Sequence, residues 1–148
     1  MYPQQPGGPP QQPGGAIAVT TKYHWLGWIL AVLKPELHLN GHVAGRGWGR
    51  TVVPVVPGQH YVHVHVPYFL PPRFGPADLG VTVHPGQTVE VEYRAPMIGF
   101  LNGAIGAPPQ KYPGMTATIV LNAVGLALLL CLCGGVVLAA IAGTSTSP

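Results

Sequence analysis

The chain has 148 residues, of which 7% are charged, and its formal net charge at pH 7 is +3. The seven basic residues are scattered rather than clustered, which argues against a nucleic-acid partner. Serine and cysteine occur only at Cys131, Cys133, Ser145 and Ser147, which excludes a Ser or Cys nucleophile before residue 131. We therefore expect a protein that is not an enzyme and uses no cofactor.

Residues 1–15 form a Pro/Gln/Gly-rich segment in which PQQPGG (3–8) recurs at 10–15. A segment of this composition buries too little apolar surface to offset the entropy lost on ordering. We expect a disordered tail.

Residues 23–33 (YHWLGWILAVL) form an apolar run between Lys22 and Lys34. A run of this length is too short to cross a bilayer. A longer span over 16–33 is a minor alternative, because it would place Lys22 near its middle. Two main interpretations remain. One is a buried strand, which we favour. The other is an interfacial segment with Tyr23, Trp25 and Trp28 at the level of the lipid headgroups.

From Pro35 onward the pattern is that of short strands and regular turns. ELHL (36–39) leads into Asn40-Gly41, a hairpin signal. RTVVPVV (50–56) predicts a strand, and its Pro54 places that strand at a sheet edge. HYVHVHV (60–66) alternates, so its valines form a core face. Residues 67–79 are expected to form a loop, and strands are expected at 81–83 and 88–94.

Together these elements predict a mainly β fold: a small antiparallel β-sandwich over 16–95. A linker over 96–114, a transmembrane helix over 115–143 and a short tail over 144–148 are expected to follow it. Glu90 and Glu92 share one face of the strand at 88–94. We expect them to be solvated or paired across strands, rather than to act as an acid–base pair.

The strings HLNGHV (38–43) and GWGRTVVPVVPGQHYVHVHV (47–66) resemble the small PEGA-like or prealbumin-like β-sandwich modules. The whole chain is also similar to small membrane proteins of actinobacteria, with EYRAP (92–96) and PPQKYPG (108–114) preceding the anchor. The second resemblance implies no activity. The first implies an interaction domain at the cell envelope, with an unknown protein partner, because PEGA-type modules generally bind or scaffold.

Four of the seven histidines are candidate metal ligands: His38, His42, His63 and His65. His63 and His65 are two residues apart on one expected strand, so both point to the same face. His38 and His42 flank the expected hairpin turn. If the strands are neighbours, these imidazoles converge in a way that suits Zn²⁺ or Cu²⁺. The alternative is that the histidines merely form the exposed face opposite the valines, and we favour it.

Arg46, Trp48 and Arg50 lie in a Gly-rich turn. A tryptophan flanked by arginines is able to contact lipid headgroups or a protein partner. The alternative is a hairpin turn whose tryptophan packs on the sandwich, and we favour it.

Residues 123–142 contain no charged or strongly polar residue, and about 20 such residues in a helix cross a bilayer. We expect a tail-anchored, single-pass protein of the cell membrane whose first partner is the lipid bilayer. All the basic residues precede this run, which favours a cytoplasmic sandwich domain. Metal binding at the membrane is the alternative to the binding or scaffolding role.

Small residues recur every four positions along the expected anchor: Ala123, Ala127, Cys131, Gly135, Ala139 and Gly143. Small side chains let two helices approach closely in lipid. The stripe therefore predicts a homo-oligomer that assembles through the helix.

Replacing Gly135 by Ile places a bulky side chain near the middle of the stripe. We expect Gly135→Ile to weaken a dimer or higher oligomer that chemical cross-linking detects in membranes. Leu129→Ile, which changes a residue off the stripe, is the matched control and should leave the cross-linked species unchanged. A monomeric wild type, or equal behaviour of the two variants, would contradict the prediction.

Overall fold

The computed structural model describes residues 13–144. It divides into a β unit that ends at Pro113 and a helical unit that begins at Gly114. The expected disordered tail falls outside the described residues as far as residue 12. The expected C-terminal tail falls outside them from residue 145.

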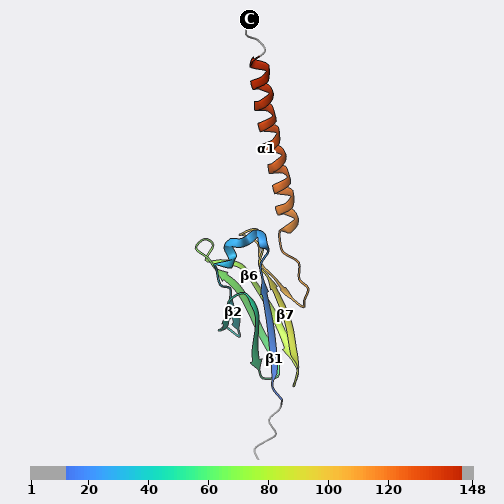
Figure 1. Cartoon of the computed structure of the whole chain (residues 1–148). Coiled ribbons are helices and arrows are strands. Elements are labelled where there is room, and N and C mark those ends of the chain that lie inside the picture. Colours follow the sequence, from blue (N-terminus) through green and yellow to red (C-terminus); the bar gives the residue numbers. More distant parts are fainter. Residues whose placement is uncertain (1–12, 145–148) are drawn as a thin grey trace, which may run out of the picture. The chain divides into compact units, whose positions relative to one another are not determined.

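The β unit is built from two four-stranded sheets (Figure 1). In spatial order, the first sheet consists of β4 (Gly49–Val55), β1 (Gly15–Lys22), β7 (Thr88–Arg94) and β8 (Ala104–Gly106). The second consists of β3 (His42–Arg46), β2 (Glu36–Leu39), β5 (Gly58–Pro67) and β6 (Arg73–Val83). The neighbouring strands are antiparallel except β1 and β7, which run parallel. The predicted mainly β fold is confirmed.

The core lies between the sheets and takes alternate residues from strands of both. Each strand turns every second side chain inward, so one apolar face per sheet is enough to build it. The largest fully buried apolar side chains of the strands come from β1, β5, β6 and β7: Ile17, Val19, Val62, Val64, Val66, Val83, Val91 and Tyr93. The predicted core face of the strand at 60–66 is therefore confirmed.

Two local predictions are confirmed by the backbone. Asn40 and Gly41 both have positive φ, 51° and 83°, as a two-residue hairpin turn between β2 and β3 requires. Pro54 lies in β4, at the edge of its sheet, where a missing N–H is tolerated.

Of the segment 67–79, expected to be a loop, only residues 68–72 form a loop, because Pro67 ends β5. From Arg73 onward it belongs to β6, which also takes in the expected strand at 81–83. The prolines misled the prediction. Pro76 sits in a strand at a sheet edge, beside a register shift between Val64 and Val66 of β5, and such positions accommodate proline.

The apolar run 23–33, for which we favoured a buried strand, contains instead a short 3₁₀ helix, η1 (Trp25–Ala31). The Leu26 N–H donates to Nδ1 of His24, which caps the first turn. Leu30 alone of the η1 residues is buried. The strand prediction failed because residues of β1, β5 and β7 already fill the core, so this run is left at the surface.

Two strands formed where none was expected. β1 occupies the centre of the first sheet, where it pairs with β4 and β7. β8 lies within the range 96–114, expected to be a linker, and pairs with β7. Glu92 of β7 is buried rather than solvated, and accepts hydrogen bonds from Lys22 and Arg94. Glu90 pairs with Arg50 across the sheet.

α1 (Met115–Thr144) is, within residues 13–144, the one helix long and apolar enough to cross a membrane, with a mean hydropathy of 2.7 over its most apolar window. Its polar side chains near the start bond to the helix's own backbone: the Thr118 hydroxyl donates to the Gly114 carbonyl, and the Asn122 amide donates to the Thr118 carbonyl. Such local bonds satisfy polar groups that lipid cannot.

Tyr93 ties the two sheets together inside the core. Its hydroxyl donates to the Gly75 carbonyl of β6 over 2.7 Å, and burial raises the pKa of Tyr93 far above its ordinary value. Removing the hydroxyl leaves a buried carbonyl without this donor, which costs about 1–3 kcal/mol.

We expect Tyr93→Phe to lower the free energy of unfolding of the sandwich by about 1–3 kcal/mol in urea denaturation of the full chain in lipid nanodiscs. Tyr68→Phe, at a largely exposed side chain, is the matched control and should change it by less than about 0.5 kcal/mol. An unchanged midpoint for Tyr93→Phe would show that the hydrogen bond to Gly75 does not stabilise the fold.

Candidate metal centre

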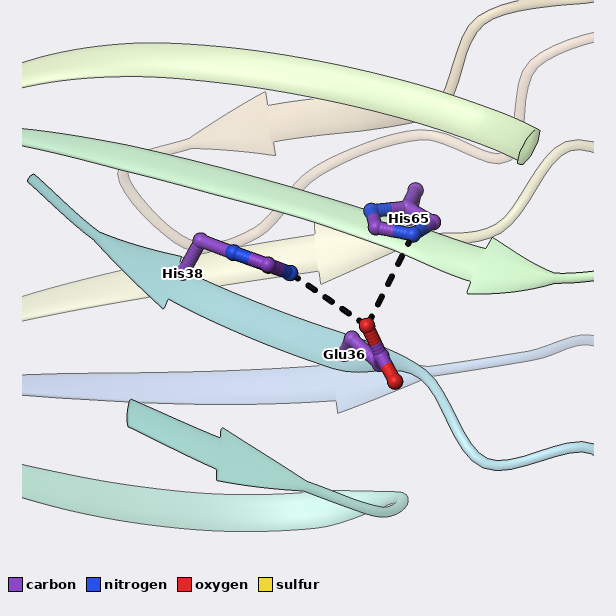
Figure 2. Close-up of side chains that lie close together, drawn as sticks. All are labelled: Glu36, His38 and His65. Atoms are coloured by element: carbon purple, nitrogen blue, oxygen red, sulfur yellow. Dashed lines mark hydrogen bonds and ion pairs between the residues drawn. The ribbon is translucent and has the colours of Figure 1, made fainter. Parts of the chain in front are cut away.

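Three side chains from β2 and β5 converge on one face of the second sheet: Glu36, His38 and His65 (Figure 2). Glu36 and His38 are two residues apart on β2, so they share a face. The register places Glu36 opposite His65 and His38 opposite His63. Cross-strand neighbours lie close enough for side chains to meet. The pairing of β2 with β5 therefore creates the cluster.

The potential ligand atoms of the cluster lie at, or somewhat beyond, the separations found between the ligands of one metal ion. Oε2 of Glu36 lies 3.3 Å from Nε2 of His38 and 3.9 Å from Nε2 of His65. The three ligand atoms all lie within 4.8 Å of one another. Ligands of a tetrahedral Zn²⁺ at about 2.0–2.2 Å lie roughly 3.3–3.5 Å apart, so the widest pair needs to close by up to about 1.4 Å.

The structure brings together three of the four predicted histidines. His38 and His65 are in the cluster, and the His63 ring lies beside both, with ring centroids 5.8 Å and 5.1 Å away. His42 is opposite Leu39 in the register, so it lies on the other face of the sheet and does not take part. Glu36 was missed by the sequence analysis, although its spacing of two residues from His38 was a usable signal.

A chain of hydrogen bonds leads from Asp78 of β6 to the cluster. Asp78 accepts from Nδ1 of His63, and this bond is the main reason why the pKa of Asp78 lies below its ordinary value. With its Nδ1 protonated, a neutral His63 offers a lone pair at Nε2, which lies 3.1 Å from Nδ1 of His65. His65 then donates from Nδ1 and carries a lone pair on Nε2, the atom that faces Glu36.

His65 is the most buried member of the cluster, with 8% of its surface exposed. Burial is the main cause that lowers its pKa, the neighbouring His63 lowers it further, and the Glu36 carboxylate opposes them. A neutral imidazole is the form that binds a metal ion. The expectation that the histidines merely form an exposed face does not describe this residue.

The three residues of the predicted Arg46–Trp48–Arg50 contact have different partners within the structure, and their contact with lipid or a protein partner stays a prediction. Arg46 donates to Oε1 of Glu36 over 2.9 Å, which holds the carboxylate so that Oε2 faces the imidazoles. Arg50 pairs with Glu90 on the other sheet. The Trp48 indole packs against Tyr23 and donates to the carbonyls of Leu30 and Leu33, each over 2.7 Å.

Two imidazoles and one carboxylate form a donor set that suits Zn²⁺ or Cu²⁺ and leaves a coordination position for a further ligand. No protein-family model matches the chain, and a search of curated proteins finds no match. The geometry of the cluster therefore carries the functional assignment.

The lowered pKa of His65 predicts how stability depends on pH in the metal-free chain. In the unfolded chain His65 takes up a proton near its ordinary pKa of about 6.5, whereas in the folded chain it does so only at lower pH. The free energy of unfolding should therefore fall as the pH drops from about 6.5 towards the lower folded pKa.

His65→Asn keeps an N–H donor near His63 but does not titrate. We expect a shallower loss of stability over this pH window in His65→Asn than in the wild type, measured by urea denaturation in the presence of a chelator. Equal slopes for the two proteins would show that His65 is not the group responsible.

Proposed function

We propose that this chain is a single-pass membrane protein whose β-sandwich binds a divalent transition-metal ion through Glu36, His38 and His65. The apolar helix α1 supports the anchor, by its length and mean hydropathy. The His/Glu cluster supports the metal site. The cytoplasmic side expected from the position of the basic residues stays a prediction.

One observation carries the metal proposal. Nε2 of His65 lies 3.9 Å from the Glu36 carboxylate oxygen at a nearly buried position. In the tautomer assigned through the Asp78–His63–His65 hydrogen bonds, this nitrogen carries a lone pair. Two acceptors that face each other repel unless a cation lies between them. The lowered pKa of His65 disfavours a proton in that place near neutral pH, and a metal ion supplies the missing positive charge.

Histidine and carboxylate ligands favour Zn²⁺ and Cu²⁺ over Mg²⁺ and Ca²⁺, which prefer six or more oxygen ligands. In the metal-free chain Nε2 of His38 donates a hydrogen bond to Glu36, so binding of the ion displaces a proton from that nitrogen. The Asp78–His63–His65 chain orients the His65 ring, as outer hydrogen bonds do at metal sites.

The chain is proposed to bind metal without catalysing a reaction. Three protein ligands leave one coordination position for water or for a ligand from a partner. From the sequence, binding or scaffolding at the cell envelope was the preferred function, and metal binding was the alternative. The His/Glu cluster favours the alternative, and a location at the cell envelope stays a prediction.

We expect the full chain in lipid nanodiscs to bind about one Zn²⁺ or Cu²⁺ per molecule, measured by calorimetry and by elemental analysis after dialysis. Glu36→Gln and His38→Asn each remove one ligand and should abolish stoichiometric binding. Mg²⁺ and Ca²⁺ should not compete.

His42→Asn is the matched control for His38→Asn, because His42 lies on the opposite face of the same hairpin. It should bind metal as the wild type does. Asp78→Asn keeps every ligand but removes the carboxylate at the start of the hydrogen-bond chain, and should weaken binding about 10- to 100-fold. A wild type without stoichiometric metal, or full binding by Glu36→Gln, would refute the proposed site.

A further inference from the structure

One end of the β-sandwich carries large apolar side chains that point into solvent. We call it the apolar end and define it by six residues, each between 69% and 93% exposed: Trp25, Trp28, Val32, Phe69, Leu70 and Phe100. They come from η1 and the residue after it, from the loop between β5 and β6, and from the segment between β7 and β8. A soluble surface rarely gathers such side chains without a partner for them.

Contacts inside the β unit place these three segments at the same end. η1 follows Lys22 at the end of β1, and Lys22 pairs with Arg94 at the end of the parallel strand β7, so η1 and the segment after β7 leave the sheet together. The segment after β7 also meets the start of β6, because the Gly103 N–H donates to the Pro76 carbonyl. Figure 1 shows η1 and the β5–β6 loop at the end of the sandwich opposite the start of β1.

The helix η1, which carries the exposed tryptophans, is fixed to the sandwich by hydrogen bonds from Trp48. Trp48 donates to the carbonyls of Leu30 and Leu33, at the end of η1 and just after it. Leu30 is buried in the core, while Trp25 and Trp28 remain exposed. The exposed side chains of η1 are therefore carried by an element that is fixed to the core, and their exposure follows from the fold.

The charged residues on the three segments that form the apolar end have one sign. The segments 23–35, 67–73 and 95–113 contain no aspartate or glutamate, and their charged residues are Lys34, Arg73 and Lys111. Aromatic and aliphatic side chains with basic neighbours and no acidic ones are typical of surfaces that enter the headgroup region of a bilayer, and anionic lipids add to the attraction.

The chain leaves the β unit at this same end. The Met97 N–H donates to the Pro113 carbonyl over 3.0 Å, and the Tyr112 hydroxyl donates to the Tyr23 carbonyl, just before η1. Pro113 is the last residue of the β unit, and α1 begins at Met115. The last residues of the β unit therefore lie at the end of the sandwich where η1 begins.

We propose that the apolar end docks into the headgroup region of the bilayer that α1 crosses. The inference rests on the proposed insertion of α1 and is independent of the metal site. Docking buries the side chains of η1 and the β5–β6 loop at the water–lipid boundary. The short tether keeps the apolar end close to that boundary, which raises its effective concentration there. The sandwich is then oriented on the membrane instead of tumbling on a linker.

Quenching of tryptophan fluorescence by brominated lipids tests the proposal on the full chain. The background protein carries Trp25→Phe and Trp28→Phe, which keep the end apolar and leave the partly buried Trp48 as a reference. Four variants each add one tryptophan: Phe69→Trp and Phe100→Trp at the apolar end, Val56→Trp at the opposite end, and Leu130→Trp in α1. Each is reconstituted into vesicles of phosphatidylcholine and phosphatidylglycerol with bromine at a shallow or a deep acyl position.

We expect shallow bromine to quench Phe69→Trp and Phe100→Trp severalfold more than Val56→Trp, an equally apolar and exposed control site beyond β4. Deep bromine should quench Leu130→Trp, which reports insertion of α1 separately. Quenching at Leu130→Trp alone would overturn docking and leave the anchor standing. A blue shift at the apolar end without quenching would mean that protein covers this end, and would overturn docking too. No quenching at Leu130→Trp would overturn the anchor itself.

Discussion

The parallel pairing of β1 with β7 is the constraint from which the rest of the molecule follows. Every other neighbouring pair of described strands is antiparallel, so the two strands of each pair end at opposite ends of the sandwich. β1 and β7 instead run in the same direction and deliver their following segments to one end. A parallel pair needs a long connection, and here that connection includes η1, β4 and the whole second sheet. The same pairing thus closes the sandwich and gathers its apolar segments.

The metal-binding candidate depends on a second, simpler rule, the alternation of side chains along a strand. The valines of β5 fill the core, and this forces His63 and His65 onto the other face. β2 lies beside β5 in a register that sets Glu36 against His65. These polar residues do not contribute to the core. Their hydrogen bonds to one another and the burial of His65 arise from side chains packed on the outer face of the sheet.

The sequence was informative where local chemistry decides the structure. Asn40-Gly41 signalled its hairpin, Pro54 signalled an edge strand, and the alternation at 60–66 identified both the core face and a face that carries histidines. It failed where the decision is made by distant parts of the chain. Whether residues 23–33 are buried depends on what else fills the core, and no local pattern reveals that. Glu36 joins the cluster only through the register of β2 on β5, which is a tertiary property.

If α1 anchors the chain as proposed, the placement of Pro54 has a consequence for molecules that share one membrane. Confinement to a surface raises local concentration in two dimensions, and exposed strand edges are the features through which β proteins stick to one another under such crowding. β4 forms one outer edge of the first sheet, and Pro54 interrupts its row of N–H donors. The edge is thereby a poor template for another copy's strand, so neighbouring sandwiches on a densely occupied surface are kept from fusing into a continuous sheet.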